Sequence, residues 1–183
     1  DGIGPKRIAM ITKAWEAQKE IKEIMIFLQG HGVSATYSAK IFKQYGNQSI
    51  EVVKENPYRL ARDIHGIGFI TADKIAQNLG IDPNSLIRAK AGVVYVLNEL
   101  TDEGHVYYPE KSLLKKAEEV LKVDQKIIIK AVTELSTEKE IFLEEINNGE
   151  LRKAVYLDPF YVAETGIAQM LKRLKESPSN VRP

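Results

Sequence analysis

The chain has 183 residues, of which 44% are hydrophobic and 28% are charged, and it contains no cysteine. This composition is typical of a folded protein of one large or two small domains, and it excludes disulfides and thiolate-bound metals. No stretch is apolar enough to cross a membrane and no signal peptide is visible, so we expect a cytoplasmic protein without a membrane partner. Because the sequence starts at Asp1 inside a motif, we also expect a segment of a longer protein.

Charge is unevenly distributed along the chain, although the net charge is only +1. Residues 1–80 contain 11 Lys and Arg against 8 Asp and Glu, residues 81–150 contain 9 against 14, and residues 151–183 contain 6 against 3. Contacts with phosphate need positive charge. A nucleic-acid surface is therefore expected within the first 80 residues, with an acidic region after it.

The first 81 residues are predicted to form helices separated by short turns. A helix over residues 5–28 has proline at its first position, and Gly30 follows its last turn. Its apolar stripe of Ile8, Ile11 and Trp15 is expected to lie in the core. Further helices are predicted from the cap at Ser34 to Gly46, over 49–53, over 58–61 and over 69–79.

From residue 82 onward the pattern changes to mixed helices and strands. Helices are predicted over 86–103, 110–121, 124–135 and 160–175, and strands over 104–109, 140–144 and 152–157. Asn147-Asn148-Gly149 is a strong hairpin signal between the last two strands. This order of elements is typical of a winged-helix domain. The sequence therefore predicts a mainly α fold with helical repeats over 1–81, a small α+β winged-helix-like domain over 82–158, and a helix with a linker over 159–183.

Three Gly-x-Gly triplets precede predicted helices: Gly2-Ile3-Gly4, Gly30-His31-Gly32 and Gly66-Ile67-Gly68. Glycine permits a sharp turn and a close approach of the backbone to a ligand. A helix that starts directly afterwards adds unpaired N–H donors and partial positive charge. Three such features within 70 residues indicate a partner with repeated phosphates, which is a nucleic acid.

Aligning the triplets on their first glycines predicts which helix positions pack. In the third copy, Ala72 and Ile75 stand at +6 and +9, on one helix face that is expected to pack against the preceding helix. The same positions hold Ile8 and Ile11 in the first copy and Thr36 and Ala39 in the second. The third copy is thus the best match to the template and the second copy the poorest.

The predicted phosphate contacts are glycine amides and polar side chains at the helix starts. They are Gly2, Gly4, Lys6, Arg7, Gly66, Gly68, Thr71 and Lys74. The weaker candidates are Gly30, Gly32 and Ser34, since Val33 and Ala35 replace the polar positions there. The alternative interpretation is that all these glycines only form tight turns between packed helices.

A second DNA hypothesis concerns the winged-helix-like segment, whose recognition helix would be residues 124–135 with Lys126 and Lys130 facing outward. Glutamates crowd the expected wing, and they would repel phosphate, so a protein-docking or spacer role is favoured there. No catalytic arrangement stands out. The histidines His31, His65 and His105 lack carboxylate partners at ligand spacing, and no metal site is expected.

Residues 66–76, Gly-Ile-Gly-Phe-Ile-Thr-Ala-Asp-Lys-Ile-Ala, resemble a helix-hairpin-helix motif, and Gly2-Ile3-Gly4-Pro5-Lys6 resembles a second one that lacks its first helix. The chain as a whole is similar to the N-terminal region of bacterial RecD-like helicases of superfamily 1. The strings that carry this resemblance are Lys43-Gln44-Tyr45-Gly46, Glu55-Asn56-Pro57-Tyr58-Arg59-Leu60 and Tyr95-Val96-Leu97-Asn98-Glu99.

The resemblance implies a parent ATP-dependent DNA helicase that moves 5′ to 3′ and acts in repair or recombination. ATP and magnesium are implied for the motor domains of that parent, to which this region would connect. The phosphate-binding string Gly-x-x-x-x-Gly-Lys-Ser/Thr does not occur in these 183 residues, so no catalytic site is expected here. Two other interpretations stay open: a protein-docking adaptor of the helicase, or the DNA-binding part of a repair nuclease.

Overall fold

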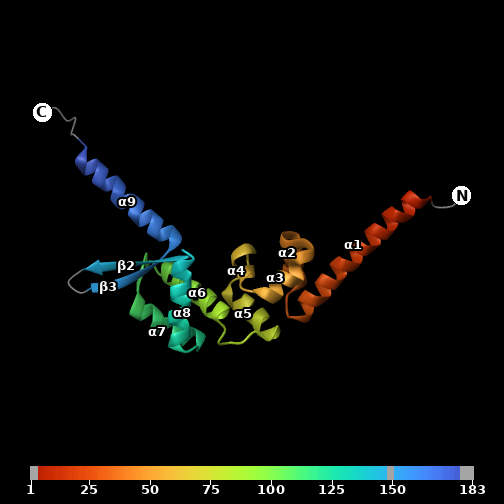
Figure 1. The fold of residues 1–183 in the computed structure, drawn as a ribbon, viewed down its shortest axis with the longest axis horizontal. Helices are drawn as coiled ribbons and strands as arrows, with labels where there is room; N and C mark the ends of the chain where they lie inside the picture. The colour runs from red at the N-terminus through yellow and green to blue at the C-terminus, as the bar shows by residue number, and fades with distance from the viewer. Residues whose placement is uncertain (1–3, 148–150, 178–183) are drawn as a thin grey trace. The chain divides into compact units, whose positions relative to one another are not determined.

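The computed structural model describes residues 4–147 and 151–177, and Figure 1 shows how its helices and strands follow one another. The chain divides into two compact units, the first ending at Arg88 and the second beginning at Ala89. Most of the described chain is helical, and the strands in it form a three-stranded sheet. The predicted fold class, mainly α with a small α+β part, is therefore confirmed.

The first unit consists of helices joined by short turns. Its elements are α1 (Pro5–Gly30), α2 (Ala35–Tyr45), a 3-10 helix η1 (Gly46–Gln48), α3 (Ser49–Glu55), α4 (Arg59–Asp63) and α5 (Phe69–Asn78). Ser34 caps α2, as the sequence predicted, because its hydroxyl accepts a hydrogen bond from the amide of Tyr37. Leu28 of α1, Ile41 of α2 and Leu60 of α4 are fully buried and belong to the core of this unit.

The second unit combines helices with the small sheet. Its elements are α6 (Leu86–Asp102, which starts in the first unit), β1 (Tyr108–Pro109), α7 (Glu110–Leu121), α8 (Gln125–Thr137), β2 (Ile141–Asn147), β3 (Leu151–Leu157) and α9 (Asp158–Glu176). The strands are antiparallel in the order β1-β3-β2. This is the order of elements predicted for a winged-helix domain. Asn148 and Gly149 of the predicted hairpin turn lie outside the described residues.

Strand β1 is shorter than the predicted strand over 104–109. Gly104 has φ +93° and ends α6 with a tight turn, in which its amide donates to the Thr101 carbonyl at 2.9 Å. The His105 amide donates to the Leu100 carbonyl at 3.0 Å, so it is unavailable for a sheet. The residues that favoured a strand here are used to terminate a helix instead.

The prediction that Trp15 lies in the core is wrong. Its side chain is 71% exposed, and Ile8 and Ile11 on the same stripe are 53% and 54% exposed. The buried residues of α1 lie near its C-terminal end, where Ile24 and Leu28 pack. On a helix with 3.6 residues per turn, the stripe of Trp15 and the stripe of Leu28 point in different directions. An apolar stripe indicates a helix, but it does not say whether another element covers it.

We expect Trp15→Ala to change the free energy of unfolding by less than about 0.5 kcal/mol, because an exposed side chain loses few contacts. Urea unfolding followed by circular dichroism measures this change. Leu28→Ala in the same helix is the matched control, with an expected loss of about 2–5 kcal/mol. A loss of similar size at Trp15 would contradict the exposed placement.

The hairpins at the second and third Gly-x-Gly triplets are complete, with a helix on each side of the turn. They align with each other differently from the alignment predicted from the sequence. The first hairpin turn (residues 31–34) joins α1 to α2, and the second hairpin turn (residues 64–68) joins α4 to α5. The left-handed glycines are Gly32 at φ +84° and Gly66 at φ +95°. Gly32 thus corresponds to Gly66, whereas the sequence alignment had matched Gly30. Gly30 is instead the last residue of α1.

The corrected register explains which helix positions are buried. The counterparts of Ala72 and Ile75 are Ser38 and Ile41, and all four side chains are at most 2% exposed. Thr36 and Ala39, which the sequence alignment placed at the packing positions, are exposed. The packing pattern of the template is therefore correct, and its application to the second triplet was shifted by two residues.

Candidate nucleic-acid interface

The second hairpin turn is anchored by the buried side chains of Ile64 and Ile67, and it exposes its glycines. Ile67 is 3% exposed, and its amide donates to the Ile64 carbonyl at 3.0 Å. Gly66 has the left-handed φ that favours glycine. Gly68 is extended, with φ −93° and ψ 177°, so any residue could adopt its conformation. Apart from Gly68 itself and its two chain neighbours, no described residue has an atom within 4 Å of the position that a Cβ would take on Gly68, and its surface is therefore open.

Several amide donors of this turn have no partner within the described chain. The amides of Gly66, Gly68, Ile70 and Thr71 donate no hydrogen bond to any described residue, and the Ala72 amide makes the first bond of α5, to Gly68 at 3.1 Å. Such donors at a helix start favour an anion. The Thr71 hydroxyl also makes no hydrogen bond among the described residues. This turn therefore carries a local set of unpartnered donors whose chemistry suits an anion.

Two lysines bring positive charge to the same place. Lys74 is exposed on α5, one turn after Thr71. Lys40 is exposed on α2, and its Nζ donates to the His65 carbonyl at 3.0 Å. An ammonium group has three donors, so Lys40 has two more to offer. The predicted residues Gly66, Gly68, Thr71 and Lys74 are thus brought together with a cation that the sequence analysis missed.

Lys40 could have been found by aligning Gly32 with Gly66. In that register Lys40 corresponds to Lys74, so both hairpins carry a lysine at the same helix position. The contact of Lys40 with the turn of the other hairpin has no signal in the sequence. It results from packing of α2 beside the second hairpin turn, where His65 is 25 positions away from Lys40 along the chain.

The first hairpin turn has fewer donors to offer. The Gly32 amide already donates to the Gln29 carbonyl at 3.0 Å, and the Tyr37 amide donates to the Ser34 hydroxyl at 3.3 Å. The Asn78 side chain covers this turn and donates to the His31 carbonyl at 2.9 Å. A Cβ on Gly32 would stand 2.6 Å from Asn78 Nδ2. The weaker candidates Gly30, Gly32 and Ser34 therefore have a less open geometry than the second turn.

The candidates at the start of α1 lie apart from the second turn along the fold. Gly4 precedes α1 in an extended conformation, with φ −66° and ψ 156°, and Lys6 and Arg7 are exposed in the first turn. Helix α1 has 26 residues, which corresponds to a length of about 39 Å. Only its C-terminal end leads into the hairpins. Gly2 lies outside the described residues.

The second unit presents exposed lysines on α8 and exposed glutamates on β2. Lys126 and Lys130 are exposed on α8, as predicted. Glu144 and Glu145 are exposed on β2. Burial and the neighbouring Glu144 carboxylate raise the pKa of Tyr156 to about 12. The negative charge of β2 therefore acts on Tyr156, and it disfavours a phosphate beside that strand.

Comparison with known proteins assigns the chain to a family. Residues 17–107 match the family model described as the ATP-dependent RecD2 DNA helicase HHH domain. Over 186 aligned positions, the chain is 25% identical to the ATP-dependent RecD2 DNA helicase of Deinococcus radiodurans, and the alignment covers 97% of the chain. Residues 17–107 belong to the helix-hairpin-helix domain family of RecD-like DNA helicases. The resemblance seen in the sequence is confirmed.

This RecD-like chain spans about a quarter of its relative, since the alignment covers 26% of the Deinococcus helicase. The matched helix-hairpin-helix segment contains both complete hairpin turns and the whole of α6. Gly4, Lys6 and Arg7 precede it. The family match and the most open set of amide donors therefore coincide on the second hairpin.

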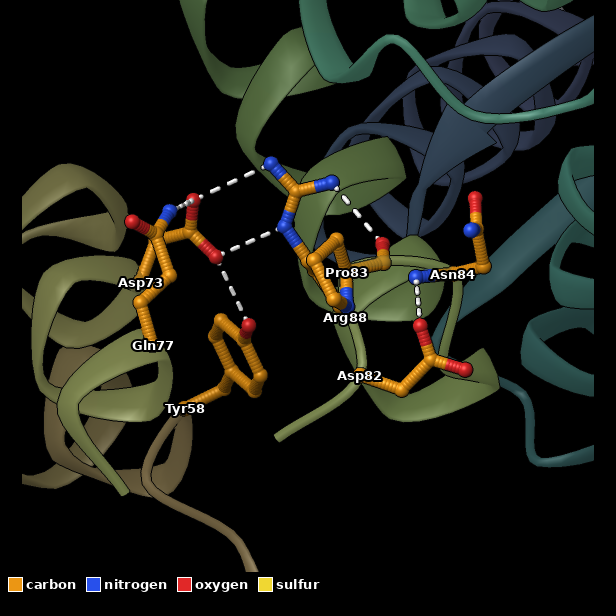
Figure 2. A network of polar contacts seen from close by, with 7 residues as sticks. All are labelled: Tyr58, Asp73, Gln77, Asp82, Pro83, Asn84 and Arg88. Carbon is orange, nitrogen blue, oxygen red and sulfur yellow. Dashed lines mark hydrogen bonds and ion pairs between the residues drawn. The ribbon is translucent and has the colours of Figure 1, made fainter. Parts of the chain in front are cut away.

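A buried polar network fixes α5 of the RecD-like hairpin domain, and the sequence analysis missed it (Figure 2). Arg88 contacts both carboxylate oxygens of Asp73, from Nε to Oδ1 at 2.8 Å and from Nη2 to Oδ2 at 3.1 Å. The Tyr58 hydroxyl donates to Oδ1 at 2.7 Å, and Gln77 donates to Oδ2 at 3.2 Å. Asp73 is only 8% exposed. Because Asp73 lies between Thr71 and Lys74, the network holds the helix that carries both.

The described part of this RecD-like chain shows neither a metal-binding cluster nor a membrane-spanning helix. Residues 4–147 and 151–177 contain no group of three or more His, Asp or Glu side chains placed to hold a metal ion. Over the same ranges, no helix combines the length and the apolar character needed to span a bilayer.

Proposed function

We propose that the second hairpin binds the sugar-phosphate backbone of DNA without reading its bases, as part of an ATP-dependent DNA helicase. The observation that carries this proposal is the set of unpartnered amides at Gly66, Gly68, Ile70 and Thr71 beside exposed Lys40 and Lys74. Backbone amides and lysines contact phosphate oxygens, which are the same for every sequence. The similarity to RecD2 helicases supports DNA as the partner.

In the proposed parent, this region would hold DNA beside motor domains that move 5′ to 3′ during repair or recombination. ATP and magnesium would act in those motor domains. The residues of this chain do not fit them, because its sequence has no phosphate-binding loop of the form Gly-x-x-x-x-Gly-Lys-Ser/Thr. We therefore assign DNA contact, and no step of ATP hydrolysis, to these 183 residues.

The decisive experiment compares DNA binding of the chain with that of two variants of the second hairpin. We expect Lys74→Glu to weaken binding by about tenfold on every DNA sequence tested, since one favourable phosphate contact becomes repulsive. Fluorescence anisotropy with unrelated labelled duplexes, titrated with salt, measures this. The logarithmic salt slope should become shallower by about 0.9 for each lost phosphate contact. Gly68→Val should also weaken binding, by covering the amides.

The second variant separates loss of contact from loss of fold. Gly68 is extended and has open space around it, so valine is compatible with its backbone. Lys130→Glu on α8 is the matched control, because it makes the same charge change on an exposed helix of the second unit. Wild-type affinity in both hairpin variants would remove the second hairpin from the DNA surface. A loss in Lys130→Glu alone would assign DNA binding to the winged-helix-like unit.

We also propose a protein-docking role for the second unit. The supporting observation is the exposed pair Glu144 and Glu145 on β2, which disfavours phosphate but is compatible with a basic protein surface. The motor domains of the same helicase are the proposed partner.

A further inference from the structure

We propose that Tyr37, on the helix of the first hairpin, is a positioning residue that holds the second hairpin turn in its phosphate-binding shape. This inference rests on the proposed DNA binding by that turn. The Tyr37 hydroxyl donates to the Gly66 carbonyl at 2.6 Å. The two residues are 29 positions apart in the chain, and neither the family match nor the sequence pattern assigns this role to Tyr37.

The contact matters because a peptide unit is planar, so fixing its carbonyl also fixes its N–H group. The Gly66 carbonyl shares a peptide plane with the Ile67 amide, which donates to Ile64 at 3.0 Å. Tyr37 and Ile64 therefore hold the two ends of one plane. In this arrangement the plane after Gly66 cannot rotate without losing both hydrogen bonds.

Lys40 acts on the preceding peptide plane. Its Nζ donates to the His65 carbonyl at 3.0 Å, and it lies 5.6 Å from the centre of the Tyr37 ring. In a trans peptide the N–H group points away from the carbonyl, so the Gly66 amide is directed away from Lys40. Two consecutive planes are thus held on either side of Gly66, whose φ of +95° would otherwise be one of several accessible to glycine.

The second hairpin also holds the turn of the first hairpin. Asn78, at the end of α5, donates to the His31 carbonyl in the first hairpin turn at 2.9 Å. Each hairpin therefore supplies, from its second helix, a side chain that holds the turn of the other hairpin. The phosphate-facing amides of the second turn depend on both hairpins being folded together.

The test is Tyr37→Phe, which removes one hydroxyl and no charge. We expect DNA affinity at low salt to fall at least about threefold, in line with the loss of one hydrogen bond. We also expect the Ile67 amide to exchange its hydrogen faster, as measured by nuclear magnetic resonance, because the peptide plane after Gly66 is released. Circular dichroism and the thermal midpoint verify that the fold is kept.

Tyr45→Phe is the matched control on the same helix. The Tyr45 hydroxyl donates to Asp63 Oδ2 at 2.7 Å, and burial together with this bond raises the pKa of Tyr45 to about 12. The Tyr45–Asp63 hydrogen bond also links the first hairpin to the second. Its acceptor, however, is a side chain and not the backbone of the hairpin turn. DNA affinity and Ile67 exchange should therefore change less in Tyr45→Phe than in Tyr37→Phe.

The outcomes separate this inference from the proposed function. If the unchanged chain binds DNA and Tyr37→Phe matches Tyr45→Phe in affinity and in Ile67 exchange, Tyr37 is not a positioning residue and the DNA proposal stands. If the unchanged chain fails to bind DNA at low salt, the proposed function falls, and the role of Tyr37 in DNA binding falls with it. If Tyr37→Phe loses DNA affinity and speeds Ile67 exchange while Tyr45→Phe does not, the result supports both the positioning role of Tyr37 and DNA binding by the second hairpin.

Discussion

Replacing Arg88 with methionine is expected to lower the free energy of unfolding by about 3–5 kcal/mol, the usual cost of breaking a buried ion pair from one side. Asp73 is 8% exposed and would be left without its cation. Methionine keeps much of the aliphatic length of arginine, so the lost contacts are mainly polar. Urea unfolding followed by circular dichroism measures the change.

A surface ion pair provides the control for Arg88. Lys19 lies 4.0 Å from Glu23 on α1, and the two side chains are 71% and 63% exposed. We expect Lys19→Met to change the free energy of unfolding by less than about 0.5 kcal/mol, because water screens an exposed pair. Equal losses in Lys19→Met and Arg88→Met would contradict a special role for the buried network.

The buried network also predicts a dependence on pH. Burial alone would raise the pKa of Asp73, but the hydrogen bonds from Arg88 and Tyr58 outweigh it and hold that pKa below the ordinary value of 3.8. A carboxylate with a lowered pKa in the folded state contributes stability above its unfolded pKa, and this contribution disappears as the pH falls through the folded value. Stability should therefore fall with acidification below about pH 4, and less steeply in Arg88→Met.

Replacing Gly92 with valine is expected to lower the free energy of unfolding by about 3 kcal/mol, through overpacking in the core of the second unit. Gly92 is buried on α6, and a Cβ there would stand 2.5 Å from Cδ1 and 2.9 Å from Cγ of Leu121. Leu121 is itself 2% exposed, so it has little freedom to move away. Thermal unfolding of the intact chain measures the loss, which would appear as a lower midpoint.

Gly166 offers a matched control for Gly92. It also lies within a helix, α9, but apart from its chain neighbours and the backbone of that helix no described atom comes within 4 Å of its Cβ position. We expect Gly166→Val to be neutral or to stabilise the chain by a few tenths of a kcal/mol, since valine has a higher helix propensity than glycine. If Gly166→Val destabilised the chain as much as Gly92→Val, the loss would not come from packing against Leu121, and the overpacking argument would be wrong.

Elements with strong local signals were predicted well. The helix over 110–121 has the predicted bounds, and α8 begins after the predicted cap, where Asp124 accepts a hydrogen bond from the Lys126 amide at 2.7 Å. These signals act within a few residues of the chain. The extent of β1 could not be predicted in the same way, because residues 104–107 suit a strand equally well until Gly104 closes α6.

In the candidate interface, too, the residues close together in sequence were predicted and those from another hairpin were not. Gly66, Gly68, Thr71 and Lys74 are close in sequence and were identified together, and their contact with DNA stays a prediction. Lys40 and Tyr37 were missed, because they reach the turn from another hairpin.

The sequence by itself determined the helical repeats, the caps, the mixed second unit and the glycine turns, since each depends on backbone preferences and apolar spacing over short stretches. Only the tertiary structure decided that Trp15 is exposed, that Arg88 pairs with Asp73, and that Tyr37 holds the Gly66 carbonyl. The reason is that burial and long-range hydrogen bonds depend on which surfaces meet. Residues 15 to 29 positions apart become neighbours only when the whole domain packs.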